Sequence, residues 1–279
     1  METIFITREN LLFCQEKAER SVMALGFFDG LHRGHCEVIK TASHKAKENN
    51  VSLSVMSFFP HPKTVISNGK RQVCYLMPLS EKKERLRELG VDTFYMVEFD
   101  QEFASLAPEQ FVAEYLLGLG VVHAVAGFDF SYGYKGTGNM ERLKRDANGL
   151  IEVTKVEKVE CKGEKISSTC IRERLLSGKV EELPDFLGSF YEVQCDWDGF
   201  SLKPHPYYTL PAPGTYFVTL QNGLRSVEAE MSVTETHSLK TLTPLPFFLK
   251  GRLSIIWHRR LSEEKSQPRG ERKLLISSI

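Results

Sequence analysis

The sequence predicts an α/β fold: a doubly wound parallel sheet followed by a second, smaller and mostly β domain. Two observations carry this prediction. Up to about residue 188, short apolar runs alternate with longer helical patterns, which is the order of a parallel sheet whose strands are connected by helices. After residue 188 prolines cluster and short β-prone runs replace the helical patterns. We therefore expect one domain over residues 1–188 and a small β domain over residues 189–279.

The expected elements of the first domain follow from these patterns. The apolar runs predict short buried strands at Val22–Phe27, Val51–Phe58, Thr93–Glu98 and Val121–Gly127. The helical patterns cover His35–Asn49, Ser80–Leu89 and Pro108–Leu119. Ser80 is a candidate N-cap of its helix, and Gly90 is a typical C-terminal glycine. In the second domain, β-prone runs occupy Thr215–Leu220, Ser226–Val233 and Arg252–Trp257.

Composition limits the classes of function. The formal net charge over 279 residues is zero, so no whole-molecule field draws the chain to nucleic acid or to a membrane. No apolar stretch approaches the roughly 20 residues of a membrane span, and the N-terminus lacks the pattern of a signal peptide. The six cysteines are scattered, which indicates free thiols in a reducing cytoplasm. We expect a cytoplasmic protein with small-molecule partners; the oligomeric state is not predicted.

One turn carries most of the chemical information. The segment from Gly26 to His35 links the first predicted strand to the first predicted helix. Gly30 and Gly34 allow a tight turn and the close approach of a ligand. The unpaired N–H groups and the dipole of a helix N-terminus favour an anion there, and His32 and His35 can add imidazole donors. We interpret the turn as a phosphate-transfer site.

Other interpretations of this turn stay open at this point. Two histidines at this spacing can be plain polar turn residues. A metal site would need further ligands, and no nearby cysteine or carboxylate run supplies an obvious set. Asp29 can be a turn residue or an N-cap.

Two loops at the carboxyl ends of the predicted strands suit a flat ring. The first consists of Phe59, Pro60, His61 and Pro62, where the prolines stiffen the backbone. The second, residues 127–138, is rich in glycine and aromatic residues, whose faces can take a ring, and its Asp129 can accept hydrogen bonds from it. The alternatives are a proline-rich connection over buried phenylalanines and a flexible surface loop.

A third segment combines hydroxyls with basic residues before a predicted helix. Ser167, Ser168 and Thr169 stand in a row, with Lys165 before them and Arg172 after them. Capping needs only one hydroxyl. The group as a whole favours phosphate binding, through hydroxyl donors and a guanidinium clamp.

Taken together, these segments resemble the adenylyltransferase module of prokaryotic FAD synthetases, a family of the HIGH-type nucleotidyltransferase superfamily with a Rossmann-like fold. The resemblance covers about residues 15–192. It rests on separated motifs in the right order: residues 26–35 (GFFDGLHRGH), 59–62 (FPHP), 75–76 (YL) with the helix after them, 99–104 (FDQEFA), 127–130 (GFDF), 167–172 (SSTCIR) and 186–188 (FLG).

The resemblance implies that ATP and FMN react to give FAD and pyrophosphate, with Mg²⁺ bridging phosphate oxygens and no metal site of the protein's own. It assigns catalysis to His32, His35 and Arg172. The ATP-binding residues it implies are Gly26, Phe27, Asp29, Gly30, Gly34, Lys165, Ser168 and Thr169. The flavin-binding residues it implies are Phe59, Pro60, His61, Pro62, Asp129 and Phe130.

The second domain departs from the family pattern. Most members carry a riboflavin kinase on a small β-barrel, with a Gly-Phe-Pro-Thr-Ala-Asn-like segment that serves metal and phosphate. Residues 193–279 contain no such segment, and Asp196–Pro204 stands roughly in its place. We expect a truncated riboflavin kinase barrel without kinase activity. Two alternatives remain for the whole chain: a nucleotidyltransferase for another phosphate substrate, or a non-catalytic flavin- or nucleotide-binding regulator.

Overall fold

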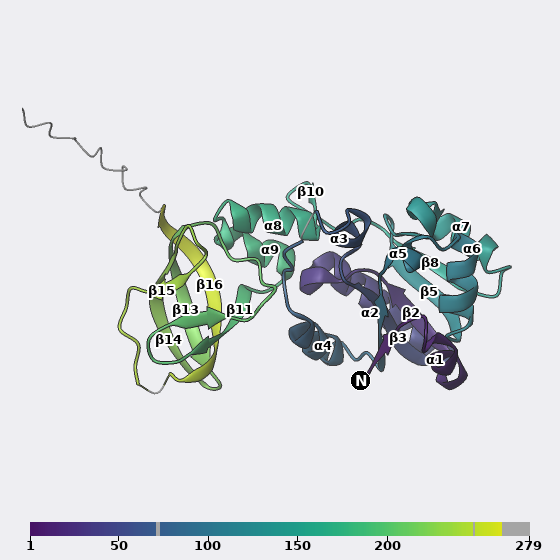
Figure 1. Ribbon diagram of the computed structural model, residues 1–279, viewed down its shortest axis with the longest axis horizontal. Helices are drawn as coiled ribbons and strands as arrows, with labels where there is room; N and C mark the ends of the chain where they lie inside the picture. The colour runs from purple at the N-terminus through teal and green to yellow at the C-terminus, as the bar shows by residue number, and fades with distance from the viewer. Residues whose placement is uncertain (71–72, 248, 264–279) are drawn as a thin grey trace, which may run out of the picture.

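A computed structural model of the protein describes residues 1–70, 73–247 and 249–263. It consists of an α/β body and a barrel body joined through helices α8 (Ser168–Leu176) and α9 (Leu183–Leu187), as Figure 1 shows. The α/β body is built on a sheet of order β1-β4-β3-β2-β5-β8, in which every neighbouring pair is parallel. The strands are β1 (Glu2–Ile6), β2 (Ser21–Leu25), β3 (Ser52–Phe59), β4 (Thr93–Glu98), β5 (Val121–Gly127) and β8 (Glu152–Val156).

Helices cover both faces of this sheet. In β2, Met23 and Leu25 belong to one apolar core, while Val22 and Ala24 belong to another. Because successive side chains of a strand point to opposite faces, this alternation places a core on each side. One core includes α2 (Arg33–Asn49) and α4 (Leu79–Glu88). The other includes α1 (Leu11–Lys17), α6 (Pro108–Phe111), the π-helix η2 (Val112–Leu117) and α7 (Met140–Asp146). The predicted doubly wound parallel sheet is confirmed.

The four predicted strands are all present, and β1 and β8 add one strand at each edge. Both edge strands are weakly buried: β1 has one buried residue and β8 has none. A strand at the edge of a sheet needs less burial, so its sequence carries a weaker signal. The apolar pattern of the sequence therefore predicted the four central strands and missed the two edge strands.

The predicted N-cap of α4 is wrong by two residues. Pro78, with φ −70° and ψ 161°, is the residue before the helix, and Ser80 lies inside the first turn without a capping hydrogen bond. Proline already holds the extended backbone that an N-cap position requires. Gly90, with φ +78°, follows the last residues of the helix as predicted.

Short elements connect the strands around the carboxyl edge of the sheet. They are η1 (Asp29–Leu31), α3 (Pro62–Ile66), α5 (Gln101–Ala104), β6 (Ser131–Tyr132), η3 (Tyr134–Gly136), β7 (Gly138–Asn139), β9 (Glu160–Cys161) and β10 (Glu164–Lys165).

The barrel body is a closed barrel of order β11-β12-β15-β14-β13-β16. Its strands are β11 (Tyr191–Trp197), β12 (Leu202–Pro204), β13 (Gly214–Asn222), β14 (Arg225–Val233), β15 (Leu239–Thr241) and β16 (Gly251–Glu263). The three predicted β-prone runs lie in β13, β14 and β16, so the mostly β character of the second domain is confirmed for its described part; residues 264–279 lie outside it. Fully buried side chains, among them Val218, Met231 and Trp257, form its core.

The last helices before the barrel pack on it. They are α8 (Ser168–Leu176), η4 (Val180–Glu182) and α9 (Leu183–Leu187). Ile171, Leu183 and Phe186 share one apolar core with Tyr191 and Trp257. The barrel core therefore extends back before residue 188, while the division of the chain at that residue stays a prediction.

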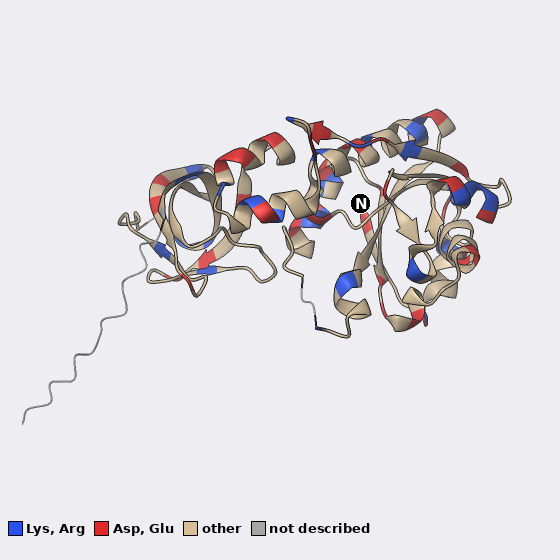
Figure 2. Cartoon of the chain, turned by 90° about the horizontal axis from the view of Figure 1, so that it is seen from above, with Lys and Arg blue, Asp and Glu red and all other residues tan. Residues whose placement is uncertain are grey.

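Charge is distributed evenly over the molecule. Acidic and basic residues are interspersed on both bodies (Figure 2), in keeping with a formal net charge of zero. Within the described part of the chain, no helix combines the length and the apolar character needed to cross a membrane.

Candidate active site

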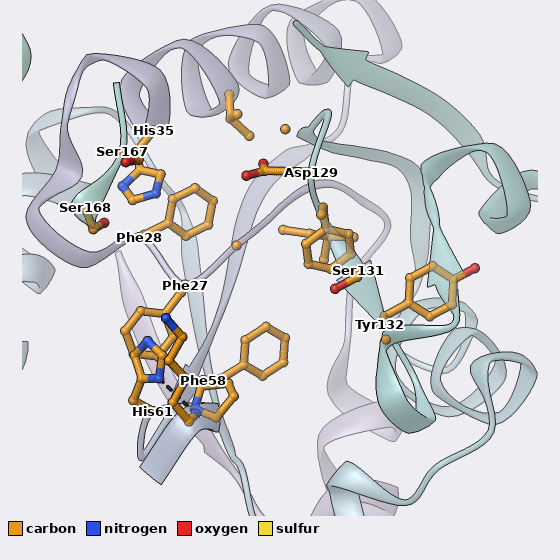
Figure 3. A pocket seen from close by; sticks show the side chains of 18 of the residues that line it. Phe27, Phe28, His35, Phe58, His61, Asp129, Ser131, Tyr132, Ser167 and Ser168 are labelled. Atoms are coloured by element: carbon orange, nitrogen blue, oxygen red, sulfur yellow. Dashed lines mark hydrogen bonds between the residues drawn. The ribbon is translucent and has the colours of Figure 1, made fainter. Parts of the chain in front are cut away.

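A cavity of about 690 Å³ opens at the carboxyl ends of the strands. It is lined by residues that follow β2, β3 and β5 and by the start of α8. The chain leaves β2 toward β3 on one side, while β5 lies on the other side of β2. The cavity thus lies at the point where the strand order reverses, which is where open α/β sheets bind their ligands. Figure 3 shows its polar side around His35 and Ser168 and its aromatic side around Phe27 and His61.

The turn after β2 is held in an unusual backbone conformation. Phe28 and Leu31 have positive φ values of 53° and 39°, and Gly30 has φ +80°. A Cβ on Gly30 would lie 2.7 Å from Cδ1 of Leu76, so packing as well as backbone requires glycine here. Gly26, Phe27 and Gly34 line the cavity, but Asp29 and Gly30 face Leu76 instead.

The two histidines of the turn stand together on the cavity wall. His32 is the N-cap of α2, and its Nδ1 accepts the backbone N–H of His35 at 3.3 Å. The rings stack with centroids 3.6 Å apart. Burial lowers the pKa of His32 to about 4 and that of His35 well below its usual value. Both rings are therefore neutral at pH 7, and the proton of His32 is on Nε2, because Nδ1 is an acceptor.

An unsatisfied atom marks the same wall. Nδ1 of His35 is buried and has no hydrogen-bond partner among the described residues. Buried polar atoms are nearly always paired. A polar atom without a protein partner on a cavity wall is suited to contact a ligand.

The three hydroxyl residues at the start of α8 have different contacts. Ser167 is the N-cap and accepts the N–H of Cys170 at 3.2 Å. Ser168 donates to the carbonyl oxygen of Asp29 at 2.9 Å, which ties α8 to the turn after β2. Thr169 lines the cavity. One hydroxyl caps the helix, and the N-terminus of α8 opens into the same space as that of α2.

Arg172 is held in place by a buried carboxylate. Its guanidinium donates to Asp29 and, through Nε, to the carbonyl of Cys74 at 2.8 Å. Asp29 is fully buried and also accepts the N–H of Leu76 at 2.9 Å. Burial raises the pKa of Asp29, and the charge of Arg172 opposes that rise. Further N–H groups of Arg172 remain for a ligand in the cavity that it lines.

The proline loop forms the aromatic side. The ring of His61 lies 4.3 Å from that of Phe27, centroid to centroid, and the backbone N–H of His61 donates to the Tyr75 hydroxyl at 3.0 Å. Burial lowers the pKa of His61 to about 4. Pro62 lines the cavity with His61, whereas Phe59 lines a different cavity and Pro60 lines neither.

A salt bridge joins two residues that the sequence assigns to different substrates. Nζ of Lys165 lies 2.6 Å from the Asp129 carboxylate, and both side chains are partly exposed. The same ammonium sits 4.6 Å from the centre of the Phe128 ring. Phe130 lines the cavity beside this pair. Lys165 and Asp129 thus line the cavity as an ion pair.

The sequence alone assigned no role to two further groups of residues at or beneath the cavity. Phe103 and Phe111 line the cavity from α5 and α6; the only signal was the aromatic pattern of residues 99–104. Lys82 lies beneath the turn and donates from Nζ to the carbonyl of Phe27 at 2.9 Å. Burial lowers its pKa to about 8. Within the charged α4 sequence nothing distinguishes this lysine from its neighbours.

Comparison with known proteins decides the family. The family model for FAD synthetase matches residues 14–170, more than half of the chain. A Listeria monocytogenes protein named FAD synthetase is 34% identical over 198 residues, which are 70% of this chain and 80% of the relative. The chain belongs to the FAD synthetase family. The family match ends before the barrel body begins.

Other FAD synthetase relatives are longer than the matched part. A Bacillus subtilis protein named bifunctional riboflavin kinase/FMN adenylyltransferase is 44% identical over 194 residues, 70% of this chain but only 61% of the relative's own length. Among solved structures, one from Streptococcus pneumoniae described as a macrolide-efflux protein superposes with a TM-score of 0.82 at 26% identity. It covers 96% of this chain, and 93% of that protein is matched, so both bodies of this FAD synthetase family member recur there.

Proposed function

We propose that the protein is an FMN adenylyltransferase, which transfers AMP from ATP to FMN and releases FAD and pyrophosphate. One observation carries the proposal. The N-termini of α2 and α8, together with Arg172, face a cavity whose other side is aromatic. Helix N-termini and a guanidinium suit the phosphates of both substrates. The aromatic side, with Phe27 and Phe128, suits the flavin ring.

The reaction needs no nucleophile from the protein. A phosphate oxygen of FMN attacks the α-phosphorus of ATP, the bond from that phosphorus to the pyrophosphate oxygen breaks, and pyrophosphate leaves with the electron pair. The protein contributes position and charge neutralisation. His32 and His35 each offer one N–H as neutral imidazoles, and Arg172 supplies the fixed positive charge. Asp29 is a positioning residue, since it holds Arg172 without lining the cavity.

Mg²⁺ is assigned to the substrate side of the site. Among the described residues, no three His, Cys, Asp or Glu side chains are grouped as a metal site. Asp129 and Glu157 line the cavity and can support an ion that is held mainly by phosphate oxygens. Such an ion would neutralise charge on the leaving pyrophosphate. The proposed location is the cytoplasm, in keeping with six cysteines that are all free.

We further propose that the barrel has no riboflavin kinase activity. Roughly where the family resemblance implies the threonine and asparagine of a kinase, this chain has the short turn between β11 and β12. There the Asp198 carboxylate accepts the N–H groups of Phe200 and Ser201 at 2.9 and 2.8 Å. These hydrogen bonds hold the pKa of Asp198 below its usual range. The Asp198 carboxylate is therefore used to hold its own turn, which is a structural role and not the metal or phosphate binding of a kinase.

A product assay tests both parts of the proposal. The purified full chain is incubated with ATP, Mg²⁺ and either FMN or riboflavin, and the flavins are separated by chromatography. We expect FAD from FMN and no FMN from riboflavin. Absence of FAD in the first reaction would refute the transferase, and FMN in the second would refute the loss of kinase activity.

A further inference from the structure

A second cavity, of about 310 Å³, lies between the two bodies. The α/β body contributes Phe59, Tyr75 and Lys82, and the barrel body contributes the loop from His205 to Tyr207. Its lining shares only Phe58 with the first cavity. The proposed transfer reaction does not use this space.

Aromatic rings line this second cavity. The Tyr75 ring lies 6.0 Å from that of Phe59 and 5.8 Å from that of Tyr207, centroid to centroid. Phe59 and Tyr207 are 42% and 58% exposed, although both are large apolar rings. Tyr207 also has φ +76°, a left-handed conformation that aromatic residues rarely adopt. Backbone strain that presents an exposed ring at a cavity is typical of a functional position.

One buried cation points to the chemistry of the ligand. Lys82 lines this cavity, is only 4% exposed, and donates to the carbonyl of Phe27 and to the Ser57 hydroxyl. An ammonium carries more N–H donors than these two acceptors use. A ligand that fits would therefore be a planar ring with a hydrogen-bond acceptor at its edge. The volume is less than half that of the first cavity, which suits a ring system and not a dinucleotide.

We propose that this cavity is a second binding site, for the tricyclic ring of a flavin, with a ring carbonyl accepting a hydrogen bond from Lys82. The ring packs against the aromatic side chains that the two bodies present to the cavity. The choice of flavin as the planar ring rests on the proposed function. A protein that binds FMN in its first cavity is exposed to flavin, so the same ring is available to the second cavity.

The second site is connected to the first. The Tyr75 hydroxyl accepts the N–H of His61 in the first cavity, and the Tyr75 carbonyl accepts two hydrogen bonds from Thr209 of the barrel body, at 2.8 and 2.9 Å. Lys82 in turn holds the carbonyl of Phe27. A ring bound here contacts the residues that position the aromatic side of the first cavity.

Lumiflavin tests the proposal, because it carries the flavin ring without the phosphate chain and cannot be adenylylated. Its fluorescence is titrated with the full chain and with single variants. We expect two sites in the unaltered protein. Tyr207→Ala weakens one of them about 10-fold or more, the loss expected when a stacking ring is removed, whereas Tyr207→Phe retains both. Phe128→Ala weakens the other site.

The controls separate this inference from the proposed function. Phe200→Ala removes a 96% exposed ring of the barrel body outside both cavities and leaves both sites intact. A single lumiflavin site, or two sites that Tyr207→Ala does not change, overturns the inference even if FAD is made from FMN. Two sites with the expected responses, in a chain that makes no FAD, leave the second site standing and refute the transferase.

Discussion

The two sides of the first cavity are built in different ways. The polar side, which is the proposed phosphate side, is fixed by buried polar contacts, with Asp29, Arg172 and Ser168 joined in one network. The aromatic side, which is the proposed ring side, includes loop residues that are partly exposed, as Phe128 is at 38%. Both sides meet at residues 74–77, which contact Arg172, Asp29 and His61. The difference teaches that the residues proposed for the chemistry are preorganised, whereas the exposed residues of the proposed ring side are held by fewer contacts.

Removing the charge of the phosphate side is expected to have the largest effect. Arg172→Ala lowers the rate of FAD formation roughly 100-fold or more, because a donor to transition-state charge is typically worth that much. His32→Ala acts in the same direction. The measurement is kcat with ATP and FMN. Arg174→Ala is the matched control, since Arg174 lies on the same helix but pairs with Glu164 and Glu182 outside the cavity. An Arg172→Ala protein of normal rate would show that the phosphate side does not carry the chemistry.

Breaking the buried pair beneath that side comes next. Asp29→Ala leaves the guanidinium of Arg172 without its carboxylate and lowers the free energy of unfolding by about 3–5 kcal/mol. Denaturant unfolding measures the loss. Lys165→Ala removes a partly exposed ion pair of the ring side and costs less than about 1 kcal/mol. Equal losses in the two variants would contradict the contrast between the two sides.

Acid is expected to destabilise the protein through its buried histidines. The pKa of His32 falls from 6.5 to about 4 on folding, so between these values the unfolded chain binds more protons. The histidine's contribution to stability is complete above pH 6.5 and is lost as pH falls toward 4. Unfolding measured over this window shows the slope, and His32→Asn reduces it. His44→Gln, at a side chain 72% exposed, serves as the control.

The smallest effect is expected where the two sides meet. Thr209→Val removes the hydroxyl hydrogen bond to the Tyr75 carbonyl and costs about 1 kcal/mol of stability. Because Tyr75 holds the loop of His61, KM for FMN rises while kcat changes little. The exposed Thr236→Val, whose hydroxyl contacts only neighbouring hydroxyls, changes neither value. A fall in kcat alone would place the effect of the barrel on the phosphate side.

Sequence patterns predicted several site residues correctly as members of the cavity wall where the pattern lies within a few neighbouring residues of the chain. The glycine turn, the hydroxyl row and the proline loop were each found by local pattern, and the strand order brings them to one cavity. Asp29 shows the limit. The turn indicates a polar site, but burial against Leu76 and the link to Arg172 depend on residues 47 and 143 positions away.

The sequence by itself determined the parallel sheet, the β-rich second body and the glycine turn after the first buried strand, because hydrophobic periodicity and glycine placement act over a few residues. Tertiary structure alone decided that the histidines are neutral, that Phe59 turns to a second cavity, and that the barrel contacts the residues behind the first. Burial and contacts between distant segments set these properties, and neither leaves a local pattern in the chain.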